Sequence, residues 1–369
     1  KTVVGYADKI NKCRFFGLYG GDNDTKVFVS GNPDEKNVDW YSGTYDPTYF
    51  PDTGYTKIGS DASAIVGYIK QYDTQIILKE SNNQDASQFL RTCEFDSDNK
   101  IYFPVAQGVA GVGAVSMTAS ALLEDIPLVL TKQGVYAVVS TSVANQRMMS
   151  GRSNLINQKL LAEDGLENAV MFEYKGKCFV CVNSRCYIAD SQQTYRDGTM
   201  QYEWYYWENI PAVCLMEHDG YLYFGTNDGK LCRFYKSTEA DCYNDNGQPI
   251  EAYWVTPYLY FGTWNRYKTV RNVHVVPLPY ARSGIEIYYN TEESMELLAL
   301  DENIDLFTFD NLDFSRFTFR TIQAPVPYAT GQKERKIVLF QVKVRNAELN
   351  EPFGFLAIQI NYTIGGKVK

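Results

Sequence analysis

The sequence predicts an all-β protein, in which a β-propeller of roughly five to eight blades is followed by a β-sandwich-like domain. Three observations predict this fold class. Aromatic residues make up 15% of the 369 residues, with 29 tyrosines and 20 phenylalanines, and these side chains favour strands. A hairpin pattern recurs along residues 1–245, which we assign to the propeller. Strands continue without that period over residues 246–369, which we assign to the sandwich-like domain.

The recurring pattern is a short apolar strand, a polar tight turn and a second strand. Its turns lie about 40 to 60 residues apart, near the roughly 40 to 50 residues that a four-stranded blade needs. The segments are 21–29, 71–78, 131–138, 174–181 and 218–224. The longest interval predicts an insertion at the glycine-rich stretch 108–113, which permits close packing, and at 114–123, read as a buried strand and a short helix. A β-meander or a sandwich remains the alternative.

The last repeat is the most regular, with predicted strands at 212–217, 221–226 and 231–236. A turn-rich stretch at 241–249 then predicts a domain boundary. The strands predicted beyond it are 251–261, 269–276, 284–290, 316–321, 336–345 and 354–362. In the last two, alternate residues are apolar and share one face, which is typical of a sandwich that packs beside or completes the propeller.

Composition argues against several functional classes. The formal net charge is −9 and no run of Lys or Arg stands out, so the electrostatic footprint of a duplex-binding protein is missing. Only two histidines are present, which disfavours histidine acid–base chemistry. No apolar run is long enough to cross a membrane, and no membrane partner is predicted. The start lacks both a Met and a signal pattern, so we expect a trimmed or partial polypeptide.

The eight cysteines are too dilute for a disulfide scaffold and are expected to be reduced, in a protein of cytosolic origin. Cys178 and Cys181 have CxxC spacing and Cys186 is close by, but residues three apart in a strand point to opposite faces and no nearby His completes a zinc site. The Asp-rich turns 22–24, 96–98 and 241–245 lack the distal Glu of a calcium loop. No metal and no cofactor is therefore predicted.

A glycosidase would need two or three converging carboxylates, and the candidates placed in loops are Asp34, Asp46, Asp61 and Asp219. Their spacing singles out none of them, so no catalytic residue is predicted. His218 beside Asp219 is interpreted as ordinary turn chemistry, because no Ser or Cys nucleophile accompanies it.

One aromatic cluster is a candidate contact for a partner or a glycan, because aromatic residues dominate interface hot spots. It comprises Trp204, Tyr205, Tyr206 and Trp207. The equally weighted alternative is that it forms a core strand of a blade.

Three stretches resemble a known family. Residues 26–34, 38–43 and 46–51 resemble the "VFVSGNP…W.SG..DPTYFP" segment of propeller-like structural proteins encoded in the tail modules of tailed bacteriophages and prophages. Residues 111–115 and 127–136 are similar to a second stretch of these proteins, and 360–367 to their common ending. The resemblance implies a role similar to that of the nozzle and stopper-like components of short-tailed phages, which form rings around the DNA path.

The resulting hypothesis is a non-enzymatic bacteriophage virion structural protein, a nozzle-like tail or connector component that acts through protein–protein assembly. The implied partners are other phage tail or connector proteins, further copies in a homo-oligomeric ring, and transiting DNA in passive contact. The implied location is the virion, assembled in the cytoplasm of the bacterial host. The alternatives are a carbohydrate- or receptor-binding propeller at the tail tip and, less favoured, a propeller glycoside hydrolase.

Overall fold

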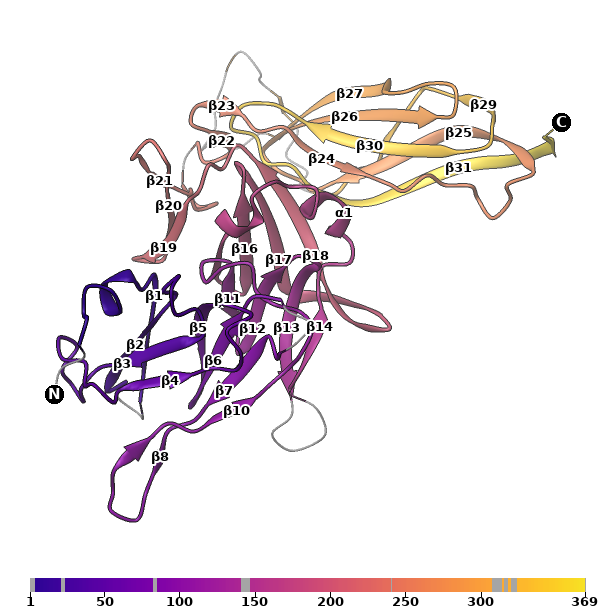
Figure 1. The fold of residues 1–369 in the computed structure, drawn as a ribbon. Coiled ribbons are helices and arrows are strands. Elements are labelled where there is room, and N and C mark those ends of the chain that lie inside the picture. Colours follow the sequence, from indigo (N-terminus) through magenta and orange to yellow (C-terminus); the bar gives the residue numbers. More distant parts are fainter. Residues whose placement is uncertain are drawn as a thin grey trace. The chain divides into compact units, whose positions relative to one another are not determined.

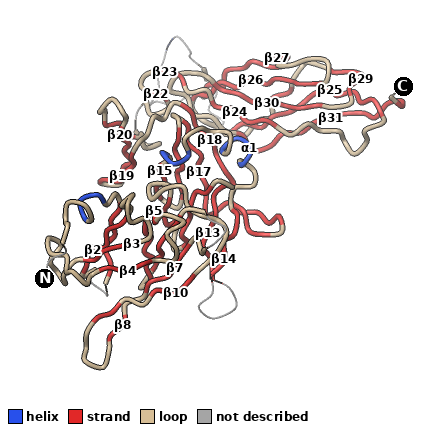
Figure 2. The backbone as a smooth tube through the Cα atoms, in the orientation of Figure 1, coloured by secondary structure: helices blue, strands red, loops and turns tan. Residues whose placement is uncertain are grey.

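The computed structural model describes residues 4–20, 24–81, 85–140, 147–239, 241–306, 314, 318–319 and 324–368. The chain divides into two compact units, Lys1–Phe234 and Tyr235–Lys369. Strands dominate both units (Figures 1 and 2), and the helical elements among the described residues are α1 (Asn157–Leu160) and the 3-10 turns Ile10–Lys12 and Leu166–Asn168. The prediction of an all-β protein is confirmed. No helix in the described ranges combines the length and apolar character needed to cross a membrane.

The first unit consists of small antiparallel sheets that follow one another along the chain. The blade strands are β1 (Phe15–Tyr19), β2 (Lys26–Ser30), β3 (Val38–Tyr41), β4 (Tyr55–Lys57); β5 (Ile65–Gln71), β6 (Thr74–Lys79), β7 (Gln88–Arg91), β10 (Val105–Gln107); β11 (Ser120–Leu123), β12 (Ile126–Thr131), β13 (Gly134–Ser140), β14 (Arg147–Gly151); β15 (Val170–Tyr174), β16 (Lys177–Val182), β17 (Arg185–Asp197), β18 (Thr199–Glu208); β19 (Cys214–His218), β20 (Tyr221–Gly225) and β21 (Leu231–Arg233). The first strand of each sheet contacts the first strand of the next, from β1 through β5, β11 and β15 to β19. This is the arrangement of propeller blades, and the described residues form five of them.

The predicted hairpins all belong to blades, although residues 21–23 of the first lie outside the described residues. Four of them join the first two strands of a blade, whereas 131–138 joins β12 and β13, the second and third strands of blade three. The long interval before it has two causes. That hairpin sits one strand later in its blade, and the small hairpin β8–β9 (Glu94–Phe95, Ile101–Tyr102) is inserted into blade two. The predicted insertion at 108–123 is therefore wrong. Of the buried strand and short helix expected at 114–123, the structure forms one strand, β11, which belongs to blade three.

Hydrophobic side chains fill the spaces between successive blades. One cluster lies between blades one and two and includes Tyr19, Phe28 and Ile77. Others lie between blades two and three, three and four, and four and five. Blades two, three and four therefore pack against a neighbouring blade on each face, which explains strands such as β6 and β12 that are buried over nearly their whole length.

A fully buried ion pair joins the first two blades. Asp39 on β3 and Arg91 on β7 are 2.6 Å apart between Oδ2 and Nη2, and both side chains are 0% exposed. Arg91 also donates to Gln75 Oε1 at 2.8 Å, and its guanidinium lies 4.2 Å from the ring centroid of Phe28. Removing one partner would leave the other charge buried without compensation.

A second buried carboxylate, Glu163, accepts hydrogen bonds from three side chains of blade four. Arg185 donates at 2.8 Å, the Tyr187 hydroxyl at 2.8 Å and the Asn183 amide at 3.2 Å. Burial disfavours ionisation of Glu163, but the hydrogen bonds and the Arg185 charge outweigh it and lower the pKa of this carboxyl. Folding therefore favours the ionised form.

We expect acid to destabilise the first unit. The pKa values of Glu163, Asp85 and Asp190 are lowered by folding, so the stability they contribute is present above the ordinary carboxyl pKa of about 4 and is lost as pH falls through the folded-state values. Thermal unfolding of the wild type and of Glu163→Gln, measured between neutral and strongly acidic pH, checks this. The variant should unfold at a lower temperature at neutral pH and show a shallower dependence on pH. Equal slopes for the two proteins would contradict it.

One pair of cysteines is oxidised. Cys181 on β16 faces Cys186 on β17, and the two form a disulfide, so the expectation that all cysteines are reduced is wrong. Cys178 packs in the core on the opposite side of β16, where burial raises the pKa of its thiol to about 12. Cys178 and Cys181 thus point to opposite faces of β16, as the strand periodicity predicted.

The second unit is a β-sandwich, as predicted. A hairpin of β22 (Asn244–Asp245) and β23 (Gln248–Pro249) precedes it, and the predicted boundary after residue 245 falls within this hairpin. One sheet has the order β24-β30-β26-β27, and in the other β25 pairs with β28, β29 and β31. The strands are β24 (Ala252–Val255), β25 (Arg266–Pro277), β26 (Arg282–Thr291), β27 (Leu297–Asp305), β28 (Tyr328–Ala329), β29 (Glu334–Ile337), β30 (Phe340–Asn346) and β31 (Phe355–Lys367).

The core of the sandwich is formed by alternate residues of both sheets, including Val273, Ile287 and Val342. The strands β27 and β28 were not predicted, and the predicted strand 336–345 joins the end of β29 to β30. The predicted strand at 316–321 lies, apart from residues 318–319, outside the described residues.

Candidate functional site

The predicted aromatic cluster lies on β18, the outer strand of blade four. This strand pairs with β17, in a register that places Trp207 opposite Cys186 and Tyr205 opposite Ile188. Successive side chains of a strand point to opposite faces. The four aromatic residues are therefore divided into two pairs, and the structure assigns them to different environments.

Trp204 and Tyr206 pack toward blade three. The Trp204 indole Nε1 donates to the carbonyl oxygen of Arg152 at 2.9 Å, and the Tyr206 ring lies 5.2 Å from that of Tyr187 between centroids. Lys159 lies over the Tyr206 ring, with its Nζ 3.2 Å from the centroid. This pair is half-buried against the hydrophobic cluster between blades three and four, close to the alternative considered for the whole cluster.

Tyr205 and Trp207 point to the other face and remain 41% and 44% exposed. The Trp207 ring packs against the rings of Phe179 on β16 and Phe234 after β21, with 6.0 Å between centroids in each case. Tyr205 donates its hydroxyl to Gln193 Oε1 at 2.8 Å. The two residues lie two positions apart on the strand, so their Cα atoms are roughly 7 Å apart along it. They form an open surface, which we call the β18 aromatic face.

Polar groups border the β18 aromatic face. Lys177 on β16 is ion-paired with Asp190 on β17, and its Nζ lies 5.7 Å from the ring centroid of Tyr205. The Lys177 hydrogen bond holds the pKa of Asp190 below its usual range, so the pair is charged at neutral pH. Neither residue was among the predicted site residues, although the hairpin register around Asn183 and Ser184 places them directly opposite each other.

The exposure of this face has a structural cause. Blades one to four each contain four strands, whereas the described residues of blade five form three, β19 to β21. These strands cover the inner part of blade four, including Phe179 and Ile188. In Figure 1 blade five is the small sheet of three strands labelled β19, β20 and β21. No fourth strand of this sheet is described. The side chains of β18 that point toward blade five are therefore covered no further than the contact between Trp207 and Phe234, and Tyr205 and Trp207 remain exposed.

The four carboxylates considered for a glycosidase are not brought together. Asp34 is paired with Lys12, Asp46 accepts hydrogen bonds from Thr48, and Asp219 lies beside His218. Asp61 is exposed in the loop between β4 and β5. Among the described residues no hydrogen bond or ion pair joins any two of these four carboxylates, and the pKa of Asp46 is lowered by Thr48 rather than raised. Their positions do not define a pair of acid and base groups.

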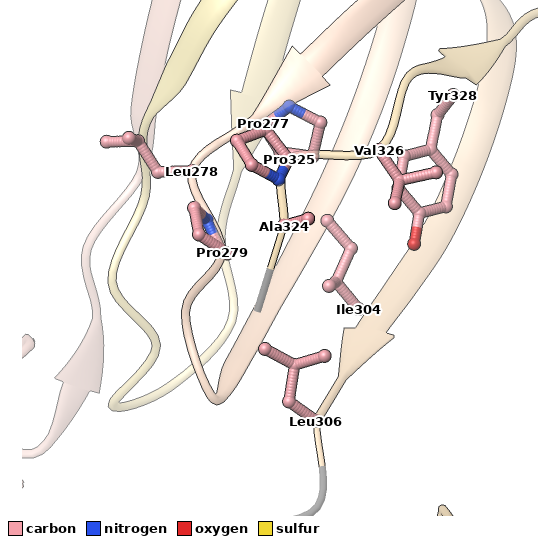
Figure 3. A pocket seen from close by; sticks show the side chains of 9 residues that line it. All are labelled: Pro277, Leu278, Pro279, Ile304, Leu306, Ala324, Pro325, Val326 and Tyr328. Carbon is pink, nitrogen blue, oxygen red and sulfur yellow. The ribbon is translucent and has the colours of Figure 1, made fainter. Parts of the chain in front are cut away.

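An apolar recess lies at one end of the sandwich (Figure 3). It is lined by Pro277, Leu278, Pro279, Ile304, Leu306, Ala324, Pro325, Val326 and Tyr328. It encloses about 10 Å³, which is about the room that one water molecule needs. This recess is too small and too apolar to hold a sugar. Within the ranges described, no group of three or more His, Cys, Asp or Glu side chains is placed to hold a metal ion.

No protein-family model matches the chain, and no curated protein sequence matches it. Several solved structures have a similar chain trace, although their sequence identity to this chain is low. A dihydro-heme d1 dehydrogenase has a TM-score of 0.37 at 13% identity, over 60% of this chain and 45% of its own, so the match spans less than half of that enzyme.

Two glycoside hydrolases are matched over more of their length. An exo-beta-1,3-galactanase from Phanerochaete chrysosporium with galactose has a TM-score of 0.28 at 7% identity, over 94% of this chain and 80% of its own. A family 43 arabinoxylan arabinofuranohydrolase from Bacillus subtilis in complex with cellotetraose has a TM-score of 0.29 at 9% identity, over 95% and 78%. At these values the likeness bears on the fold alone.

These neighbours require a correction. The solved structures named here are those of enzymes and not of phage tail proteins, and they contradict the prediction of a non-enzymatic virion structural protein of a phage tail. We therefore abandon that function. The sequence resemblance to phage proteins, the predicted ring and the virion location stay predictions.

Proposed function

We propose that the propeller unit binds a carbohydrate through the β18 aromatic face. The observation that carries the proposal is the pair of exposed rings, Tyr205 and Trp207, on one face of a rigid strand beside the Lys177–Asp190 ion pair. A sugar ring presents an apolar C–H face and a rim of hydroxyl groups. It is therefore matched by a flat aromatic surface with charged and amide groups at its border.

The site is held in place before any ligand arrives. The Trp207 ring packs against the rings of Phe179 and Phe234, and the Tyr205 hydroxyl donates a hydrogen bond to Gln193 Oε1. Rigid aromatic residues lose little conformational entropy on binding, which favours affinity. The Lys177 ammonium, on a side chain that is 40% exposed, offers donors to hydroxyl groups, and the buried Asp190 carboxylate holds it in place.

The test is a glycan-array screen of the wild-type chain, followed by titration calorimetry with the best oligosaccharide. We expect Trp207→Ala to weaken binding at least about tenfold, because a central aromatic contact is lost. Trp264→Ala is the matched control, since Trp264 is 62% exposed in the second unit and should bind as the wild type does.

Trp204→Ala separates contact from structure. Because Trp204 packs against the hydrophobic cluster between blades three and four and donates to Arg152, this variant should lose thermal stability. Binding by the folded Trp204→Ala protein should stay closer to wild type than binding by Trp207→Ala. The proposal is wrong if no glycan binds, or if Trp207→Ala binds as tightly as the wild type.

A further inference from the structure

The second unit contains a long strand with one edge unpaired. β31 runs from Phe355 to Lys367, and β25 is the one strand to which it is hydrogen-bonded among the described residues. From Ala357 to Ile364 no residue is inserted on the β31 side of the pairing, but a bulge in β25 between Val270 and Asn272 shifts the register opposite Tyr362 and Asn361, and further shifts lie beyond both ends of the segment. Alternate backbone N–H and C=O groups of this segment point away from β25 and have no strand opposite them.

This edge lacks the features that keep other edges from pairing. Exposed edge strands in natural proteins are short, bulged, or carry charges or proline. Between Pro352 and Lys367 the sequence has neither a charged residue nor a proline. By contrast, the edge strand β27 of the other sheet carries Asp301, Glu302 and Asp305.

Two side chains of β31 are more exposed than is usual for residues that face the core of a sandwich. Tyr362 is 41% and Ile364 is 45% exposed, although both lie on the face of β31 that is turned toward the core. Tyr362 stacks on Phe261, with 4.1 Å between ring centroids, and its remaining surface is open. A further strand beside β31 would cover both residues.

We infer that β31 pairs with β31 of a second copy of this chain, in an antiparallel arrangement about a two-fold axis. A two-fold axis perpendicular to the sheet pairs even-numbered residues of one β31 with even-numbered residues of the other, and odd with odd. Side chains that face the core in one copy therefore lie beside side chains that face the core in the other. With Asn361 on the axis, Ile358 meets Ile364 and Ile360 meets Tyr362. On the other face Gln359 meets Thr363. The uncharged segment is thus self-complementary, and both copies bury their open edges in one continuous sheet.

Light scattering of the full chain over a concentration series gives the first test. We expect a mass near twice 42.0 kDa at high concentration. The variant Gln359→Lys, Thr363→Lys places lysines opposite lysines, and it should raise the dimer dissociation constant about tenfold or more. Leu298→Lys adds a charge on the edge strand β27 and is the matched control, which should dimerise as the wild type does.

A charge swap tests the register. In Gln359→Glu, Thr363→Lys the two new charges are opposite in sign across the axis, so dimers should form again. Circular dichroism verifies that each variant is folded. A wild type that is monomeric at its highest soluble concentration would overturn the inference and leave the edge to a strand of another protein. Wild-type affinity in the like-charge variant, or monomers in the swapped one, would overturn it as well.

Discussion

Replacement of Arg91 by methionine is expected to lower the free energy of unfolding by about 3–5 kcal/mol. The guanidinium is fully buried and compensates the equally buried carboxylate of Asp39 at 2.6 Å. Methionine fills much of the volume but leaves Asp39 without a cation in a low-dielectric environment. It also removes the contact with the Phe28 ring. Chemical denaturation of the wild type and the variant measures the difference.

Two further variants determine whether the charge or the packing is responsible. The double variant Asp39→Leu, Arg91→Met removes both charges and should recover much of the loss, because a buried pair replaced by apolar side chains is often tolerated. Lys12→Met breaks the exposed pair with Asp34 and should leave the free energy of unfolding close to that of the wild type. A loss no larger in Arg91→Met than in Lys12→Met would refute the argument.

The second large effect is expected at Gly113, in the glycine-rich stretch. A Cβ on Gly113 would lie 1.9 Å from the backbone nitrogen of Ser81 and 2.3 Å from the carbonyl carbon of Glu80. These are main-chain atoms of the segment after β6 and cannot rotate away, so Gly113→Ala must displace one chain from the other. We expect a loss of at least about 2 kcal/mol in the free energy of unfolding.

Gly151→Ala is the matched control in the same unit. The nearest atom to a Cβ there is Asn154 Oδ1 at 3.7 Å, an ordinary contact, so this variant should unfold close to wild type. Both variants can be compared by thermal unfolding. If the two variants had similar midpoint temperatures of unfolding, the close backbone contact between Gly113 and Ser81 would not constrain the fold.

The propeller could be predicted because its blades are local. Each hairpin carries its own turn signal, and the blade spacing follows from counting turns. The strand β27 was missed because it is an exposed edge with Asp301, Glu302 and Asp305, whose composition is typical of a loop. The small residues of the wrongly predicted insertion suggested a short helix. The structure shows instead that Gly113 is small because its backbone lies close to the backbone of Ser81 in blade two.

The site was predicted in part. Strand periodicity could have divided the four aromatic residues into Trp204 with Tyr206 and Tyr205 with Trp207. Which pair is covered depends on the number of strands in blades three and five, and no local pattern in β18 contains that information. The disulfide was missed for a simpler reason. The CxxC spacing directed attention to Cys178 and Cys181, whereas the hairpin register pairs Cys181 with Cys186.

Every blade is completed within its own continuous stretch of chain, from Phe15–Lys57 for the first to Cys214–Arg233 for the last. Most contacts inside a blade therefore join residues close in sequence, which shortens the loops that must close before native contacts form. As the chain leaves the ribosome, one blade can form before the next is synthesised. Folding of the first unit should thus proceed in the order of synthesis, with each finished blade serving as the surface on which the next condenses.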